Sequence, residues 1–233
     1  MSARHLLITG ASRGLGRALA EHYLAQGDHV YGCSRSETDL VHPHYQHFEV
    51  DIGNDEAVTQ FFFKLRRQTK ILDGLINNAG VASMNAFALT PPKVFQQIFN
   101  INVQGTYLCC QKALGMLQKS AHPRIINFST VAVPLQLEGE SIYAASKSAV
   151  ETLTRIVARE YGRFGITCNA IGPSPIDTAL IRGVPKEKLA ALVERQAIKK
   201  MASPEDVINV VDFYLRPESD FISGQILYLG GVS

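Results

Sequence analysis

Residues 5–16 of the chain read HLLITGASRGLG, a short apolar run followed by three glycines. The run His5–Thr9 predicts a buried β-strand, because it is apolar and ends at a glycine. From Gly14 to Gln26, apolar residues recur at fourfold spacing and predict a helix. Glycines at 10, 14 and 16 allow a tight turn with no side chain between the backbone and a bound phosphate. The stretch therefore predicts a strand, a phosphate-binding turn and a helix.

The rest of the chain repeats the alternation of strand and helix patterns. Strands are predicted at 30–33, 46–50, 74–77, 124–129, 166–171 and 225–229, and helices at 54–68, from Pro91-Pro92 onward, at 143–161 and at 204–215. No repeat or low-complexity linker interrupts the series, and 233 residues suffice for one domain. The pattern predicts a single-domain α/β fold over residues 1–233. We expect a doubly wound, Rossmann-type parallel sheet of about seven strands with helices on both faces.

The composition is that of an ordinary globular protein. Hydrophobic residues make up 46% of the chain, charged residues 19%, and the net charge is only +2, so a nucleic-acid partner has no electrostatic support. No apolar run approaches the roughly 18–20 residues of a membrane span. The start of the chain runs straight into a strand and leaves no room for a signal peptide. We expect a cytoplasmic protein that binds neither nucleic acid nor a membrane.

Neither the cysteines nor the histidines form a convincing metal-site pattern. No C-x-x-C pair occurs, which predicts small buried thiols in a reducing compartment for Cys33, Cys109, Cys110 and Cys168. His42, His44 and His47 are spaced more like ligands, but Pro43 indicates a turn and no further ligand stands nearby. We predict no metal site, and a solvated loop at these histidines.

Two further motifs carry chemistry. Asn77-Asn78-Ala79-Gly80 ends one predicted strand, and Tyr143-Ala144-Ala145-Ser146-Lys147 opens a predicted helix. Lys147 stands one helical turn from Tyr143 on the same face. Its ammonium group is expected to lower the pKa of the Tyr143 phenol from the ordinary value of about 10. A tyrosine tuned in this way can exchange protons near neutral pH.

In this order the motifs resemble the classical short-chain dehydrogenase/reductase family over essentially the whole chain, with a general likeness to its 3-oxoacyl-thioester reductases. The resemblance implies hydride transfer to or from a nicotinamide cofactor. It implies a catalytic set of Asn102, Thr130, Tyr143 and Lys147, with Tyr143 as the general acid. It implies cofactor contacts from Gly10, Ser12, Arg13, Gly14, Leu15, Gly16, Ser34, Arg35, Asp51, Ile52, Asn78, Ala79, Gly80, Tyr143, Lys147, Pro173, Ile176 and Thr178.

Charge at the end of the second strand favours NADP over NAD. Dinucleotide folds that use NAD carry an acid there, which bonds the ribose 2′-hydroxyl. By resemblance, Ser34 stands at that position, and Arg35 follows it. Arg13 adds a second guanidinium, which suits a phosphate through its fork of donors. We therefore predict NADP(H) as the cofactor.

The catalytic hydroxyl departs from the family pattern. The family usually carries a serine thirteen residues before the tyrosine, and here that position is Thr130, preceded by Ser129. Side chains alternate along a strand, so Ser129 and Thr130 cannot both face the substrate. We predict that Thr130 faces it and that Ser129 points away.

These observations predict an NADPH-dependent oxidoreductase that reduces a ketone, with 3-oxoacyl thioesters as a candidate class, to a secondary alcohol. An NAD-dependent alcohol dehydrogenase of the same fold and a non-catalytic cofactor-binding regulatory protein remain as alternatives. Residues 178–200 are a candidate substrate lid, whose basic residues are interpreted as a solvated face rather than a carrier-protein contact. The helix at 143–161 is apolar around more than one stripe, which predicts a homo-oligomer. Family resemblance makes it a tetramer.

Overall fold

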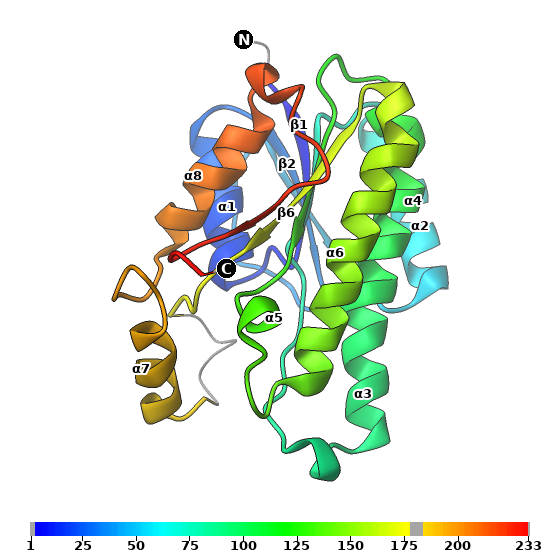
Figure 1. The fold of residues 1–233 in the computed structure, drawn as a ribbon. Coiled ribbons are helices and arrows are strands. Elements are labelled where there is room, and N and C mark those ends of the chain that lie inside the picture. The colour runs from blue at the N-terminus through cyan, green and yellow to red at the C-terminus, as the bar shows by residue number, and fades with distance from the viewer. Residues whose placement is uncertain (1–2, 178–183, 233) are drawn as a thin grey trace.

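The computed structural model describes residues 3–177 and 184–232, and in this part of the chain a parallel sheet of seven strands forms the centre of the molecule (Figure 1). The strands are β1 (His5–Thr9), β2 (His29–Ser34), β3 (Tyr45–Glu49), β4 (Gly74–Asn77), β5 (Arg124–Phe128), β6 (Thr167–Gly172) and β7 (Ile226–Tyr228). Their order across the sheet is β3-β2-β1-β4-β5-β6-β7, and every neighbouring pair is parallel. The strand order reverses beside β1. Sheets of this kind bind ligands at that switch, beyond the carboxyl ends of the strands.

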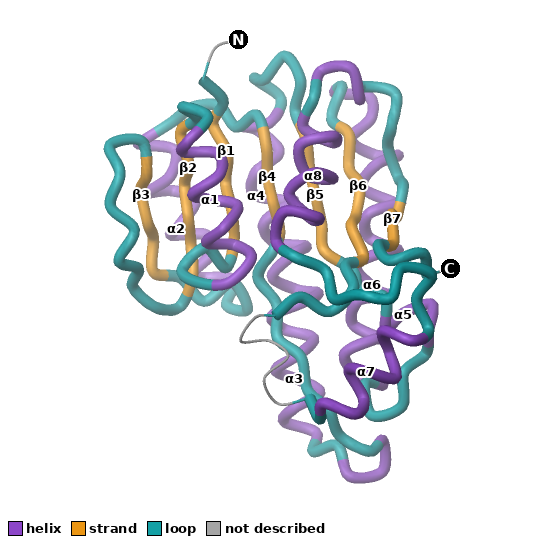
Figure 2. The backbone as a smooth tube through the Cα atoms, turned by 90° about the vertical axis from the view of Figure 1, so that its left-hand side faces the viewer, coloured by secondary structure: helices purple, strands orange, loops and turns teal. Residues whose placement is uncertain are grey.

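Helices cover both faces of the sheet. One face carries α1 (Gly14–Ala25) and α8 (Pro204–Leu215), and the other carries α2 (Asp55–Gln68), α4 (Gly105–Leu117) and α6 (Ser141–Tyr161) (Figure 1). Three shorter helices lie beyond the carboxyl ends of the strands: α3 (Pro92–Phe99), α5 (Ala132–Leu135) and α7 (Lys186–Glu194) (Figure 2). Short 3₁₀ turns occupy Phe87–Leu89, Gly162–Phe164 and Pro217–Ser219. The predicted fold class is confirmed.

Capping residues explain where several helices begin. The Asn54 side chain accepts a hydrogen bond from the Ala57 backbone N–H at 2.9 Å and so caps α2. Ser203 and Asp206 form a reciprocal capping box at the start of α8. Proline occupies the first turn of both α3 and α8, where its missing N–H costs nothing. These signals are local, and the helix starts predicted from them agree with the structure to within one or two residues.

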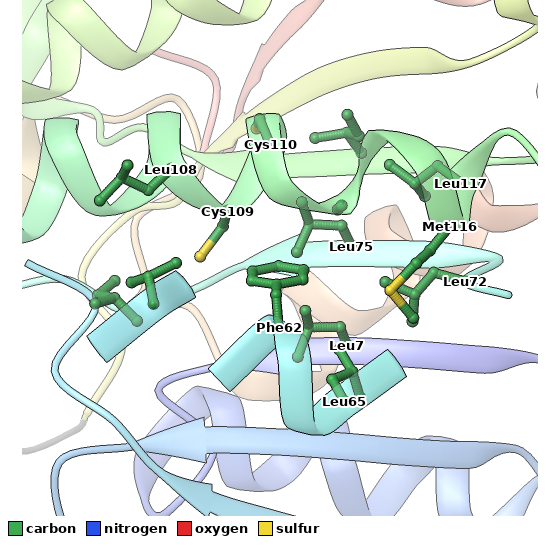
Figure 3. Packing of buried hydrophobic residues seen from close by; sticks show 14 of the residues in the cluster. Leu7, Phe62, Leu65, Leu72, Leu75, Leu108, Cys109, Cys110, Met116 and Leu117 are labelled. Carbon is green, nitrogen blue, oxygen red and sulfur yellow. The ribbon is translucent and has the colours of Figure 1, made fainter. Parts of the chain in front are cut away.

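The core lies between the sheet and its helical layers. On the α2–α4 side, Phe62 of α2 lies between Leu75 of β4 and Cys109 of α4, and all three are fully buried (Figure 3). Burying a side chain such as Phe62 stabilises the fold by about 1.5–3 kcal/mol. All four cysteines are free and buried, as predicted.

The sequence prediction missed α4. Its buried residues lie around most of the helix rather than on one stripe, because α4 packs against both α2 and the sheet. A π-helical segment, Asn100–Gln104, joins α3 to α4 and carries Asn102. Gly105 follows it, and a Cβ there would stand 2.7 Å from the Ile52 side chain. The exposed stripe of α4 is formed by Tyr107, Gln111 and Gly115. Only Gln111 among them is strongly polar, so the helix gives a weak periodic signal.

The predicted solvated histidine loop is wrong for His47 alone. His44 is exposed in a turn before β3, although its ring also lies against the His29 ring, with centroids 4.5 Å apart. His47 lies within β3, and its Nε2 is 3.0 Å from Ser34 Oγ. The pairing of β3 with β2 places His47 beside Ser34, which the turn signal at Pro43 did not reveal. Within residues 3–177 and 184–232, no cluster of three or more His, Cys, Asp or Glu side chains could hold a metal ion.

Candidate active site

A cavity of about 1260 Å³ opens at the carboxyl ends of the strands. Strand ends, α6 and α7 all contribute to its walls. Among the predicted site residues, it is lined by Gly10, Ser12, Arg13, Gly14, Leu15, Gly16, Ser34, Arg35, Asp51, Ile52, Asn78, Ala79, Gly80, Thr130, Tyr143, Lys147, Pro173 and Ile176. Asn102 lies behind this lining, and Thr178 falls outside the described residues. One cavity therefore collects residues that are far apart in the sequence.

The glycine turn is built by close backbone contacts. Gly10 has φ +72°, a conformation that favours glycine. A Cβ on Gly16 would lie 2.2 Å from the Gly10 carbonyl oxygen and 2.5 Å from Asn78 Nδ2. Asn78 Nδ2 donates to the Thr9 carbonyl at 2.9 Å, and Thr9 Oγ1 accepts from the Ala79 N–H at 3.0 Å. The asparagine motif thus holds the turn in place, at the positive end of the α1 dipole.

The end of the cavity next to β2 and the glycine turn is basic. Arg13 and Arg35 are exposed to solvent and both line the cavity. Ser34 ends β2, and its hydroxyl donates to the Ser36 carbonyl at 2.7 Å. The Asp51 carboxylate accepts from the Gly53 N–H at 3.0 Å and closes its own turn. Two guanidinium groups beside a serine form a suitable site for a phosphate.

Tyr143 and Lys147 lie one turn apart on α6, and both are buried. Lys147 Nζ donates to the Phe128 carbonyl at the end of β5, at 2.8 Å. Burial raises the pKa of Tyr143 to about 12, while a hydrogen bond with Thr130 opposes the rise. Burial also lowers the pKa of Lys147 to about 8.

These values correct the expected effect of Lys147 on Tyr143. The sequence predicted that the ammonium group lowers the tyrosine pKa, but desolvation is the largest cause and acts in the opposite direction. The Lys147 ammonium group is held by the carbonyl of Phe128. Tyr143 is consequently protonated at neutral pH and can donate its proton.

Asn102 is fully buried within the π-helical segment. Its amide is held on three sides: Oδ1 accepts from the Val81 N–H, while Nδ2 donates to the Val81 carbonyl and to Ser146 Oγ, at 2.9–3.0 Å. A Cβ on Gly80 would lie 3.3 Å from Asn102 Oδ1 and 3.4 Å from Lys147 Nζ. Asn102 therefore reaches the site from behind, next to the lysine. π-Helical bulges are frequent at functional sites.

Ser129 and Thr130 point in different directions, as strand alternation predicts. Ser129 Oγ donates to the buried carboxylate of Glu151 at 2.5 Å. Both residues line the cavity, but it is the Thr130 side chain that contacts Tyr143. Of these two hydroxyls, the one beside Tyr143 belongs to Thr130.

The predicted lid contains a helix that contributes to the site. Lys188, Leu192 and Arg195 of the segment 184–200 line the cavity. The basic residues of this segment are exposed, in agreement with a solvated face. Glu140 also lines the cavity. Burial raises the pKa of Glu140, and the positive charge of Lys188 opposes the rise. Sequence reasoning missed Glu140, because it stands in a turn before α6 and belongs to no motif.

The comparisons with known proteins agree with this geometry. A family model described as enoyl-(acyl carrier protein) reductase matches residues 10–232. The chain is 31% identical to the (2S)-[(R)-hydroxy(phenyl)methyl]succinyl-CoA dehydrogenase subunit BbsD of Thauera aromatica, over 98% of this chain and 95% of the relative. It is 30% identical to carbonyl reductase [NADPH] 2 of Sus scrofa, with 98% and 95% covered. It is 26% identical to the 3-oxoacyl-[acyl-carrier-protein] reductase FabG of Escherichia coli, with 97% and 95% covered.

A solved structure shows the same architecture. The aldohexose dehydrogenase of Thermoplasma acidophilum, in ligand-free form, superposes with a TM-score of 0.89 at 28% identity, with 99% of this chain and 94% of that chain covered. The fold and the site define an oxidoreductase of the nicotinamide-dependent class. This chain belongs to the short-chain dehydrogenase/reductase family. No helix in the described part of the chain is long and apolar enough to cross a membrane.

Proposed function

We propose that this protein is an NADPH-dependent reductase that converts a ketone to a secondary alcohol. The observation that carries the proposal is the meeting of Tyr143, Thr130 and Lys147 in one cavity with the glycine turn. Relatives named for carbonyl, succinyl-CoA and 3-oxoacyl-carrier substrates support a carbonyl reaction, and 3-oxoacyl thioesters are the first substrate class to test.

The residues present fit a dinucleotide phosphate. A side chain at Gly10 or Gly16 would collide with its neighbours, so the turn can stay compact and a pyrophosphate could approach the start of α1. Asp51 and Ile52 would border the adenine, and Asn78, Ala79 and Gly80 would border the middle of the cofactor. Pro173 and Ile176 would flank the nicotinamide, together with Thr178, which lies outside the described residues.

The preference for the phosphorylated cofactor rests on charge. Arg13 and Arg35 stand where a ribose 2′-phosphate would lie, and β2 ends in a serine rather than an acid. A relative named for NADPH gives independent support.

The chain's own residues supply proton transfer and orientation. Bound NADPH supplies the hydride. Tyr143, protonated at neutral pH, donates its proton to the carbonyl oxygen as negative charge develops there. Thr130 donates a second hydrogen bond to the same oxygen and orients it. Lys147 would hold the nicotinamide ribose, and Asn102 lies close to Lys147 on the far side of Gly80.

The assembly proposed is a cytoplasmic homotetramer. Large apolar side chains remain exposed on Phe95 of α3, Tyr107 of α4 and Ile156 of α6, which supports burial against further copies of the chain. Four free, buried cysteines suit a reducing compartment.

The test is oxidation of NADPH in the presence of a panel of ketones and 3-oxoacyl thioesters, with NADH assayed in parallel. We expect turnover with at least one member of the panel and faster turnover with NADPH at equal, subsaturating concentrations. Binding of NADPH without turnover of any carbonyl substrate would contradict the proposal and favour a cofactor-binding regulatory protein.

A further inference from the structure

Glu151 is a buried carboxylate that has no part in the proton transfer described above. It lies on α6, one turn beyond Lys147, and is 5% exposed. Two hydroxyls converge on its Oε1 atom: Ser129 Oγ and Tyr228 Oη each donate at 2.5 Å. Arg155 approaches the other oxygen at 3.7 Å from the solvent side. Buried carboxylates are costly unless their oxygens accept such bonds, so this arrangement is strongly specified.

The Ser129 bond fixes the end of β5. Ser129 stands between Phe128, whose carbonyl accepts from Lys147 Nζ, and Thr130, whose side chain contacts Tyr143. The Ser129 N–H donates to the Ile171 carbonyl at 2.7 Å. The Ser129 residue is therefore held from its backbone by β6 and from its side chain by Glu151. A shift of Ser129 would move the partners of both Lys147 and Tyr143.

The hydrogen bond from Tyr228 to Glu151 holds β7, and β7 in turn pairs with the end of β6. The Tyr228 ring lies over Gly172, where a Cβ would meet Tyr228 Cδ1 at 2.3 Å. The Leu229 N–H donates to the Gly172 carbonyl at 2.9 Å. Pro173, which follows Gly172 in the chain, lines the cavity. One carboxylate oxygen thus joins α6, β5 and β7 around the walls of the site.

We propose that Glu151 is a positioning residue that aligns Thr130 and the Phe128 carbonyl with Tyr143 and Lys147. The proposal rests on the function proposed above. Misplacement of reacting groups by about 1 Å can cost about a hundredfold in rate, so a link of this kind acts on kcat. Glu151 touches no residue of the basic end of the cavity, where Arg13 and Arg35 lie, so we expect NADPH affinity to fall less than kcat.

The test compares Glu151→Leu with Glu151→Gln in the full-length protein. Glu151→Leu removes the acceptor, and we expect kcat to fall about ten- to a hundredfold. The Kd for NADPH should rise by a smaller factor than the one by which kcat falls, because the basic end of the cavity is left unchanged. Glu151→Gln keeps an acceptor oxygen for both hydroxyls and should restore most of kcat. Glu160→Leu and Glu160→Gln, on the exposed face of α6, are the matched controls and should leave both quantities unchanged.

A second variant covers the case in which Glu151→Leu does not fold. Combining Ser129→Ala with Tyr228→Phe removes both donors and keeps the carboxylate, and kcat should fall by a similar factor with NADPH binding retained. Wild-type kcat in this double variant, or in a folded Glu151→Leu protein, would overturn the inference alone. An equal loss of kcat and NADPH affinity would reduce Glu151 to a general structural role and would also overturn it. Absence of turnover by the unchanged protein contradicts the proposed function itself.

Discussion

Two adjacent hydroxyl residues at the end of β5 have different surroundings. Both line the cavity, but the Ser129 hydroxyl donates to a buried carboxylate on α6, whereas the Thr130 side chain contacts Tyr143. Alternation along an extended chain accounts for the difference. A threonine also has a stiffer χ1 than a serine, so its hydroxyl is held more firmly.

The Thr130 hydroxyl should therefore matter more than that of Ser129. Thr130→Val keeps volume and branching but removes the donor, and we expect kcat/KM to fall about ten- to a hundredfold, because a hydrogen bond to developing charge is worth about 1.5–3 kcal/mol. Thr130→Ser should stay active. Ser129→Ala removes one of the two donors to Glu151 and should cost less than Thr130→Val or the combined Ser129→Ala and Tyr228→Phe variant. Steady-state kinetics of the three variants would contradict this assignment if Ser129→Ala were inactive and Thr130→Val active.

Arg13 and Arg35 should set the cofactor preference. We expect NADPH to bind about tenfold more tightly than NADH or better, a difference of about 1.4 kcal/mol. Arg35→Gln should lose most of that difference by weakening NADPH alone, because only the 2′-phosphate needs the guanidinium. Calorimetric titration of both cofactors measures it. Equal affinities in the unchanged protein would remove the charge argument, and Lys93→Gln, outside the cavity lining, serves as the control.

At the scale of elements, the sequence predicted those with local signals. The strands β1 and β4, the capped helices α2 and α8, and the glycine turn all follow from residues close together in the chain. Helix α4 did not, because most of its residues are buried and its exposed stripe, at Tyr107, Gln111 and Gly115, is only weakly polar. The high pKa of Tyr143 could not be read either, since it depends on burial by segments distant in sequence. Glu151 escaped notice for the same reason: its partners come from β5 and β7.

The amino ends of the first two strands carry a prediction about pH. His5 stacks on His29, with ring centroids 4.9 Å apart, and burial followed by repulsion from His29 lowers the pKa of His5 below 6.5, while Asp73 and Asp28 oppose the shift. Between the lowered pKa of folded His5 and about pH 6.5, the unfolded chain binds more protons than the folded one. The free energy of unfolding therefore rises with pH over this range. We expect the free energy of unfolding to fall as the pH drops below about 6.5 and no contribution from His5 above that value.

Denaturant unfolding at several pH values measures this effect. His5→Gln should flatten the decrease between about pH 6.5 and the lowered pKa of His5. The control His122→Gln alters an exposed histidine that is paired with Asp220 and makes no ring contact with His5 or His29. An unchanged slope in His5→Gln would show that His5 is not the group responsible.

At the scale of the whole molecule, several large apolar side chains remain exposed on the surface of the single chain. Ile156 of α6 and Tyr107 of α4 are each 46% exposed, although both helices otherwise pack on the sheet. We expect a tetramer in solution, and light scattering at micromolar concentration should give four times the mass of one chain. Ile156→Glu should shift the population to smaller species, because it places a charge in a desolvated interface. A single-chain mass for the unchanged protein would contradict the assembly.

The central claim is that Tyr143 donates the proton during carbonyl reduction. Its direct test is the rate of NADPH oxidation by Tyr143→Phe beside the unchanged protein, with NADPH affinity measured on both. Phenylalanine keeps the ring and removes the acidic hydroxyl, so we expect turnover to fall by about a hundredfold or more, at the scale of general acid catalysis, with NADPH binding largely intact. A Tyr143→Phe protein that kept about a tenth or more of the wild-type rate would contradict the claim, because loss of an essential acid costs more than that.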